Sequence, residues 1–297
     1  MKHVAACVLL TGVATVVFAG VGVPTPELSA AQIVEKNIAV RGGLEAWHNI
    51  QTMVWIGHIE TANAPASRIP FVLEQKRPNK TRFEIKVQNQ TALRIFDGIA
   101  GWKSRPSANG KPELQPFSVE ELGYELNGPS LDGPLMDAAA KGLGISLEGI
   151  DTLDGSTAYR LKVKRLSGAS QRIWIDTRTY FDLKSERLAR NAAGQTGTVT
   201  VLYHDYRPFE GVQIPMRIET GTRAATSATA PDRMVIDKVA LNLPLDDSIF
   251  AKPEVSGQHH GVTVDTRQAS QPTGPMGWPS SRSQAPFSPG PAVGPVR

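Results

Sequence analysis

Cysteine is almost absent from this chain of 297 residues, and Cys7 is the single example. Cys7 lies in an apolar stretch near the start that we expect to be removed during export. The mature chain then has no disulfide, no cysteine metal site and no cysteine nucleophile. Its stability must therefore come from an ordinary apolar core.

The chain also lacks an apolar run long enough to cross a membrane. A short basic start precedes the apolar run from Val4 to Phe18, which is shorter than the roughly 20 residues of a spanning helix. Small residues follow the run, and this order is typical of an export signal. We expect residues 1–22 to be a signal peptide and the mature protein to be soluble in the periplasm or otherwise exported. A retained anchor is the alternative.

The motifs of common enzyme classes are missing as well. The sequence contains no HExxH, GxSxG or GxGxxG pattern and no phosphate loop. His204 and Asp205 are adjacent on an expected strand, so their side chains should point to opposite faces. We therefore expect no catalytic residues, no cofactor and no metal site. Basic residues form no stripe with interleaved aromatics, so nucleic acid is not an expected partner.

Proline, glycine and serine dominate residues 257–297. Such a composition buries too little apolar surface to offset the entropy lost on ordering, so we expect a disordered tail. Residues 25–256 remain, and this length suits one large β-rich domain of roughly 200–250 residues.

Two capping boxes predict where helices begin. In this motif a Ser or Thr at the helix start is followed three residues later by Glu or Gln. Ser29 with Gln32 opens a helix that ends at Gly42-Gly43, and Ser118 opens a helix that runs through Leu126. Further short helices are expected at 44–50 and 134–141.

Strand patterns fill the rest of the domain. Residues 80–87 alternate apolar and polar side chains, as in a strand with one buried face. Turn signals such as Asp97-Gly98 separate neighbouring strands and indicate antiparallel hairpins. The expected strands are 53–61, 69–76, 80–87, 93–96, 101–104, 158–165, 171–176, 180–188, 197–205, 213–220 and 232–239. We predict an α+β fold, mostly antiparallel β, with one half-open curled β-sheet or barrel of about ten strands covered by helices.

Several segments in order resemble the LolA/LolB-like superfamily of outer-membrane lipoprotein-sorting proteins. They are IAVRGG at 38–43, KRPNK at 76–80, FDG at 96–98 with Trp102, WIDT at 174–177, YHDYR at 203–207 with GVQIP at 211–215, and the closing stretch 241–253. The resemblance covers Ser29 to Pro253. It implies a half-open β-barrel closed by helices, with an apolar cavity for acyl chains. The superfamily also contains carriers of other lipids and sensors that bind protein partners.

The candidate ligand-binding residues are taken from the apolar faces of the expected strands. They are Phe71, Leu73, Phe83, Ile85, Ile95, Leu161, Val163, Ile173, Ile175, Val201 and Ile218. Burial of each methylene group of a chain is worth about 0.8 kcal/mol, so a dry cavity of this kind would hold lipid. We expect the lid at 118–141, aided by the first helix. Trp102 and Trp174 either pack in the core or line the cavity.

Three functional classes remain. The first is a carrier of acyl chains of a lipid or lipoprotein. The second is a binding or sensor module that regulates an inner- or outer-membrane protein partner. The third is a hydrolase whose polar site the sequence does not reveal. The apolar strand faces favour the carrier over the hydrolase.

Overall fold

One antiparallel sheet of fourteen strands contains most of the residues that the structure describes. The computed structural model describes residues 28–61, 68–87, 90–105, 112–127, 131–190, 195–224, 227–228 and 230–253. The strand order is β6-β5-β4-β3-β2-β1-β14-β12-β11-β10-β9-β8-β7, with β13 beside β12. The sheet is open, because β6 and β7 form its two edges.

Hairpins connect most neighbouring strands, as the regular turn spacing predicts. The first group is β1 (Thr52–Glu60), β2 (Ile69–Lys76), β3 (Lys80–Val87), β4 (Gln90–Phe96), β5 (Gly101–Arg105) and β6 (Glu113–Pro116). The second group is β7 (Leu143–Leu153), β8 (Ser156–Arg165), β9 (Ser170–Asp176), β10 (Asp182–Arg190), β11 (Thr196–Phe209), β12 (Val212–Ala224), β13 (Ser227–Ala228) and β14 (Asp232–Leu241).

The helices are short and lie before, between and after these two strand groups in the sequence. They are α1 (Ala30–Val40), α2 (Gly43–His48), α3 (Val119–Asn127) and the 3-10 helix η1 (Asp247–Phe250). Both predicted capping boxes form: the Gln32 amide donates to Ser29 Oγ at 3.3 Å, and the Glu121 amide donates to Ser118 Oγ at 3.2 Å.

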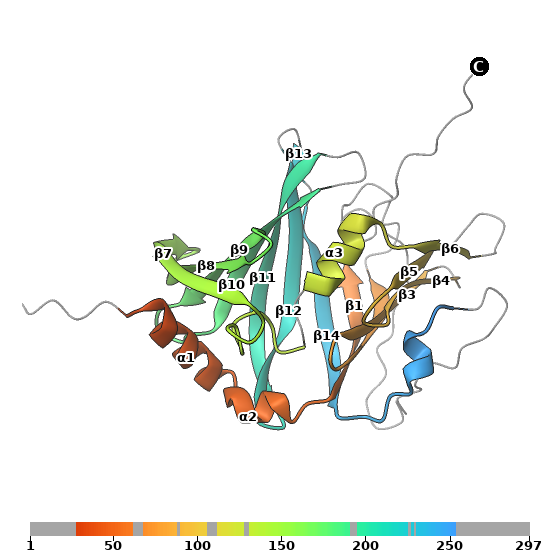
Figure 1. Ribbon diagram of the computed structural model, residues 1–297, viewed down its shortest axis with the longest axis horizontal. Helices are drawn as coiled ribbons and strands as arrows, with labels where there is room; N and C mark the ends of the chain where they lie inside the picture. Colours follow the sequence, from red (N-terminus) through yellow and green to blue (C-terminus); the bar gives the residue numbers. More distant parts are fainter. Residues whose placement is uncertain are drawn as a thin grey trace, which may run out of the picture.

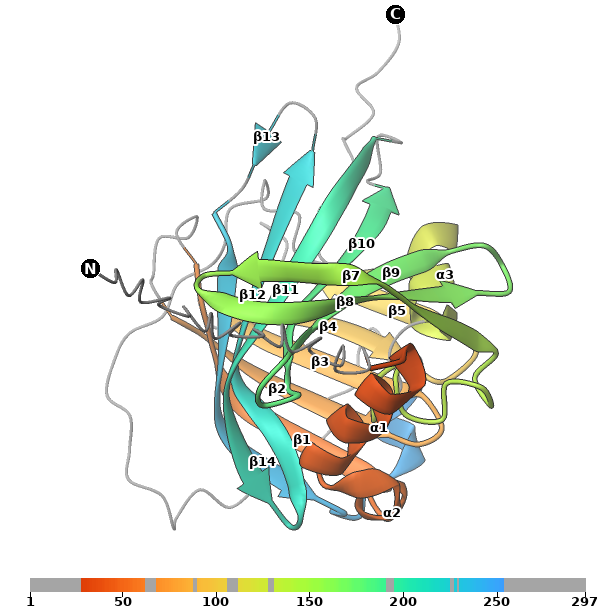
Figure 2. The same cartoon turned by 90° about the vertical axis from the view of Figure 1, so that its left-hand side faces the viewer.

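The sheet curls so that its two ends face each other (Figures 1 and 2). In Figure 1, α3 lies between the strands of the first and second groups, whereas η1 lies outside the first group. We call the face that α1 and α3 contact the inner face, and the opposite face the outer face. Alternation along each strand assigns every strand residue to one of them.

Four apolar clusters stabilise this arrangement. On the inner face, Ile33 of α1 packs on β7, β8 and β9, and Trp47 of α2 packs on β1 and β12. A third inner cluster joins β2, β3, β12 and β14 around Phe71. On the outer face, Phe250 of η1 covers β1 and β4 through Val54 and its neighbours.

A short seam inside the second strand group divides the sheet into two parts, β6 to β14 on one side and β12 to β7 on the other. Strands β12 and β14 pair only over Arg217–Thr220 and Asp232–Val235, whereas β11 and β12 pair along almost their whole lengths. Below this seam, α2 and its cluster fill the space between the diverging ends of β12 and β14. We use the word seam for these paired residues below.

The predicted class, a mostly antiparallel curled sheet with helices, is confirmed, but the count of about ten strands is too low. Strands β6, β7 and β13 were not predicted. The helix predicted at 134–141 is wrong, because these residues form successive turns and Asp137 has a left-handed φ of 50°. The predicted signal peptide and tail lie outside the described residues. Among the helices of the described part, none is long and apolar enough to cross a membrane.

Candidate functional site

The inner face gathers the predicted lining residues from both strand groups. Phe71 pairs with Ile85, and Leu73 pairs with Phe83, across β2 and β3. In the second group, Leu161 pairs with Ile173. Ser185 connects Ile173 to Val201, and the neighbouring inner pair on β11 and β12 is Tyr203 with Ile218. The same alternation places Val163 and Ile175 on this face, so every predicted residue except Ile95 shares it.

Ile95 lies on the outer face and is not brought together with the others. It pairs with Arg82 of β3. Arg82 points outward, because the adjacent Phe83 points inward. It packs under η1 with Phe250. Trp102 pairs with Ile95 and is therefore also on the outer face. Trp174 is on the outer face of β9, where its Nε1 donates to Asp151 at 2.7 Å, so neither tryptophan lines the interior.

Helix α3 is attached to the inner face of the first strand group by ion pairs. Arg94 Nη1 lies 2.8 Å from Glu121 Oε1, and Arg94 Nη2 lies 3.1 Å from Glu125 Oε1. Lys103 Nζ lies 2.7 Å from Glu121 Oε2. Burial by itself raises the pKa of Glu121, but hydrogen bonds from Lys103 and the Ser118 amide and the charge of Arg94 lower it below its ordinary value.

Few apolar contacts hold α3 in place. Val119 is 84% exposed and Leu126 is 51% exposed, so the helix leaves apolar surface in water. On the side of the second strand group, the Arg187 guanidinium lies 4.1 Å from the Tyr124 ring centroid. Helix α3 is therefore connected to both strand groups by contacts with charged side chains, to Arg94 and Lys103 on one side and to Arg187 on the other.

Phe117 forms the joint between β6 and α3. Its amide donates to the Gly101 carbonyl at 2.8 Å, and its ring lies where a Cβ of Gly101 would be. The Arg94 guanidinium covers the ring at 4.1 Å from the centroid. The absence of a side chain at Gly101 thus allows this aromatic anchor.

The segment 131–142, which we expected to belong to the lid, is packed far more tightly than α3. Leu135 is buried against α1, and Met136 is buried against α2. Asp132 is buried and pairs with Arg77 at 3.0 Å and Lys141 at 2.6 Å. This segment is therefore a fixed part of the core, and only α3 has the weak attachment of a lid.

Polar side chains interrupt the apolar inner face between the α1 cluster and the Phe71 cluster. The inner polar cluster, as we call it, consists of Asn37, Arg41, Asp182, Ser185, Tyr203 and Tyr206. Tyr206 Oη donates to the Asp182 carbonyl at 3.1 Å, and Ser185 Oγ lies 3.1 Å from Tyr203 Oη. Burial raises the pKa of Tyr203 to about 12 and that of Tyr206 well above its ordinary value, so both hydroxyls stay protonated.

The sequence did not reveal the inner polar cluster. Its members come from α1, β10 and β11, and only the fold brings them together. Asp205 has a left-handed φ of 58°, which interrupts the regular strand geometry between Tyr203 and Tyr206. One signal for it was present in the sequence. Tyr203 occupies the same alternating positions as the apolar Val199 and Val201, so alternation predicts the same face of the strand for it.

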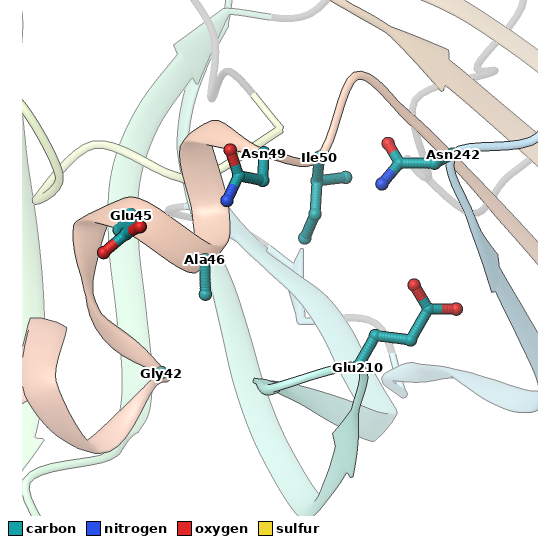
Figure 3. Close-up of a pocket in the computed structure, with 7 residues that line it drawn as sticks. All are labelled: Gly42, Glu45, Ala46, Asn49, Ile50, Glu210 and Asn242. Carbon is teal, nitrogen blue, oxygen red and sulfur yellow. The ribbon is translucent and has the colours of Figure 1, made fainter.

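A surface hollow of about 380 Å³ lies apart from the inner face, between α2 and the β11–β12 turn. Figure 3 shows Glu45 and Asn49 of the α2 region opposite Glu210 and Asn242, with Ile50 between them. Four polar side chains around the two apolar side chains of Ala46 and Ile50 do not suit an acyl chain. The inner face remains the candidate site.

Comparison with solved structures now identifies the fold. A LolA superfamily protein from Nitrosomonas europaea superposes with a TM-score of 0.51 at 15% sequence identity, over 76% of this chain and 99% of that one. The chain has a LolA-like fold. A putative outer membrane lipoprotein-sorting protein domain from Vibrio parahaemolyticus matches with a TM-score of 0.49 at 14% identity, over 75% of this chain and 96% of that one.

The fold that the resemblance to LolA/LolB-like proteins implied is thus confirmed. No protein-family model matches the chain, and no curated protein matches it.

Proposed function

We propose that this protein is an exported carrier that binds acyl chains of a lipid or lipoprotein against the inner face of its curled sheet. The observation that supports the proposal most directly is the set of apolar side chains from both strand groups that share this face. The LolA-like fold is compatible with this use, and the predicted signal peptide places the carrier in the periplasm.

The apolar inner face is covered in the described conformation. Phe71 and Ile85 are buried, and Leu161 and Ile173 are buried under α1. An acyl chain reaches them only after a covering element moves. Among the helices of the described residues, α3 alone contributes no side chain to the four apolar clusters, so we assign it the role of the lid.

The energetic balance favours exchange of cargo. Opening the lid breaks the ion pairs of Arg94 and Lys103, which are largely buried, but water then solvates the separated charges and offsets much of the lost attraction. Each methylene group that enters contributes about 0.8 kcal/mol, so a chain of ordinary length offsets that cost. Release follows when a membrane or partner offers the chain an equally apolar environment.

Two substitutions on opposite faces test the proposal. Phe83 on β3 faces inward, and Leu93 on the adjacent β4 faces outward; both are half-buried. We expect Phe83→Glu to abolish the binding of a fluorescent fatty acid, because the new carboxylate lies in the apolar contact surface. Leu93→Glu should keep binding within about twofold.

Circular dichroism shows whether each variant is folded. Native mass spectrometry of the wild-type protein, with solvent extraction, shows whether an acylated molecule copurifies. A folded Phe83→Glu variant that still binds the fatty acid, or a wild-type protein that takes up no lipid, contradicts the carrier function.

A further inference from the structure

Strand β14 has a free edge below the seam. It pairs with β1 as far as Leu241, but it pairs with β12 only as far as Val235. From Ile236 to Leu241, the side of β14 that faces away from β1 thus has no paired strand in the described part of the chain. A free edge presents unpaired backbone donors and acceptors, and natural proteins usually cover or blunt it.

The backbone groups at this edge follow from the pairing of β14 with β1. The Asn242 amide donates to the Thr52 carbonyl at 2.9 Å, so these two residues form a hydrogen-bonded pair. Bonded and non-bonded pairs alternate along an antiparallel ladder, so the amides and carbonyls of Val239 and Leu241 point away from β1. These groups have no backbone partner among the described residues. Leu241 is only 8% exposed, and unpaired backbone groups are unfavourable where water is scarce, so the edge favours a further strand.

An apolar hollow of about 310 Å³ lies beside the same edge. Its apolar lining comes from Val54 and Ile56 of β1, Val239 and Ala240 of β14, and Phe209 of β11. Val54 and Ala240 are on the outer face, whereas α2 and its cluster fill the space below the seam from the inner face. A strand paired with this edge would place alternate side chains toward the hollow. Its occupant should therefore carry apolar side chains at alternating positions.

The polar hollow of Figure 3 lies at the end of this edge. It is lined by Asn242, which follows the last residue of β14, and by Glu210, which follows Phe209 of the apolar hollow. Glu45 and Glu210 supply two carboxylates to it, and none of the described residues that line it is basic. A cationic side chain is the chemical complement of such a hollow. An occupant that runs from one hollow to the other should therefore carry an apolar part and then a basic residue.

The C-terminal tail, which lies outside the described residues, contains one segment with this order. All prolines of the tail come at or after Pro272, so residues 254–271 contain none. Within this stretch, Val262 and Val264 alternate with threonine, and β-branched residues favour strands. Arg267 follows three residues after Val264, which puts it on the opposite face of a strand. The polar hollow borders α2, so it too lies on the face opposite to the apolar hollow.

The position of η1 brings the tail to this edge. Phe250 packs in one cluster with Val54, Ile56 and Ala240, which line the apolar hollow. Residues 254–261 connect the last described residue to Val262 and span up to about 30 Å when extended. A parallel pair of strands needs a connection of a dozen or more residues, and residues 242–260 provide nineteen between β14 and this segment.

We propose that residues 261–267 pair with the free edge of β14 as a parallel strand, with Val262 and Val264 in the apolar hollow and Arg267 at Glu210. The direction follows from the order of the hollows, because Ala240 precedes Asn242 along the chain as Val264 precedes Arg267. The docked segment covers an edge that would otherwise accept a strand of a second molecule. This docking does not depend on whether the inner face binds acyl chains.

Hydrogen exchange of the full mature protein measures whether the edge is paired. The test variant is Val262→Asp/Val264→Asp, because a carboxylate is unfavourable in an apolar hollow. We expect the Val239 and Leu241 amides to exchange at least about tenfold faster in this variant than in the wild type.

The matched control is Val293→Asp/Val296→Asp, which makes the same change near the end of the tail. It should leave the exchange of the two edge amides at the wild-type rate. Equal rates in all three proteins would overturn the proposal, since the edge would then not depend on the segment.

An exchange of charges tests the polar hollow. Arg267→Glu should speed the exchange of the same amides about threefold, the effect of one partly exposed ion pair. Adding Glu210→Arg to this variant should restore the wild-type rate. Arg282→Glu, farther along the tail, is the control and should change nothing. If the double variant exchanges as fast as Arg267→Glu alone, the contact of Arg267 with Glu210 is refuted.

Engineered disulfides test the geometry. Cys7, the single cysteine, belongs to the predicted signal peptide, so introduced cysteines react without competition. Lys238 lines the apolar hollow, and Lys238→Cys/Val264→Cys should form a disulfide within one molecule under mild oxidation. Lys238→Cys/Ser283→Cys should form far less, and equal yields would refute the docking. Disulfides between two molecules, or amide protection that rises with protein concentration, would assign the edge to a second copy and likewise overturn the proposal.

Discussion

Inner-face residues stabilise the closed protein, whether or not cargo also binds to them as we propose. Leu161 is completely buried and packs with Ile33 of α1 and Ile173 of β9. In the described conformation this side chain thus belongs to the apolar core. Its contribution to stability is measurable without any ligand.

We expect Leu161→Ala to lower the free energy of unfolding by about 2–5 kcal/mol, because it leaves a cavity among well-packed neighbours. Urea unfolding followed by circular dichroism measures the change. Leu166→Ala is the control, since Leu166 is almost fully exposed and should change stability by less than about 0.5 kcal/mol. Equal stabilities of the two variants would show that α1 does not pack on β8.

At this scale, strand alternation predicted the inner face well and failed at one residue. The alternating apolar positions of residues 80–87 assigned Phe83 and Ile85 to one face, and the pairing agrees. In β4 the apolar Ile95 and Phe96 are adjacent, so alternation alone did not choose between them. The structure turns Arg94 inward because Glu121 and Glu125 of α3 compensate its charge, a contact the local sequence does not contain.

At the scale of single elements, the lid depends on its joint and on its charges. The joint is the contact of Phe117 with Gly101, where an added Cβ would lie 1.9 Å from a ring carbon. Around Gly123 in α3, an added Cβ would meet nothing within 4 Å. Substituting alanine at either glycine therefore adds one methyl group, which clashes with Phe117 at Gly101 and meets open space at Gly123.

We expect Gly101→Ala to displace Phe117 and loosen α3, with faster hydrogen exchange at 119–127 and faster lipid uptake. Gly123→Ala should have the opposite effect on exchange, because alanine favours the helix by about 1 kcal/mol over glycine. Hydrogen exchange with mass spectrometry measures both. Unchanged exchange in Gly101→Ala would contradict the role of Phe117 as the joint.

Acid should open the lid through Glu121. Its pKa is lowered in the folded protein from an ordinary value of 4.5. The ion pairs thus stabilise the docked helix fully above pH 4.5, and this stabilisation is lost as the pH falls through the lowered pKa. Spin labels on Val119→Cys and Leu188→Cys should move apart below about pH 4.5.

Glu121→Gln is the control for this pH dependence. It removes the titrating group, so the label distance should be longer than in the wild type and nearly independent of pH. A wild-type distance that stays constant down to pH 3 would show that the ion pairs do not hold the lid.

The capping boxes and turns predicted α1, α3 and most hairpins, because these signals act within a few residues. The turns at 134–141 were not predictable in the same way. Leu135 and Met136 are buried in different clusters, under α1 and α2, and tertiary packing overrides the local helix signal there. Strand β7 was not predicted, because it is stabilised by pairing with β8 and by packing against α1, and neither contact is visible in its own sequence.

At the scale of the whole molecule, the order of motifs along 29–253 predicted the LolA-like fold, although no single motif is specific. The inner polar cluster was beyond such reasoning, because it joins residues more than 140 positions apart, such as Asn37 and Asp182. Long-range convergence of this kind depends on the curl of the sheet.

The seam has a mechanical consequence. Since β12 and β14 pair over only a few residues, the parts of the sheet on the two sides of the seam, β6 to β14 and β12 to β7, resemble the arms of a pair of tongs joined at one end. A small rotation at the joint moves the far tips apart while every hairpin within each arm stays intact. We expect cargo of different girth to change the angle of the tongs, so one protein accommodates one or several chains without breaking its strands.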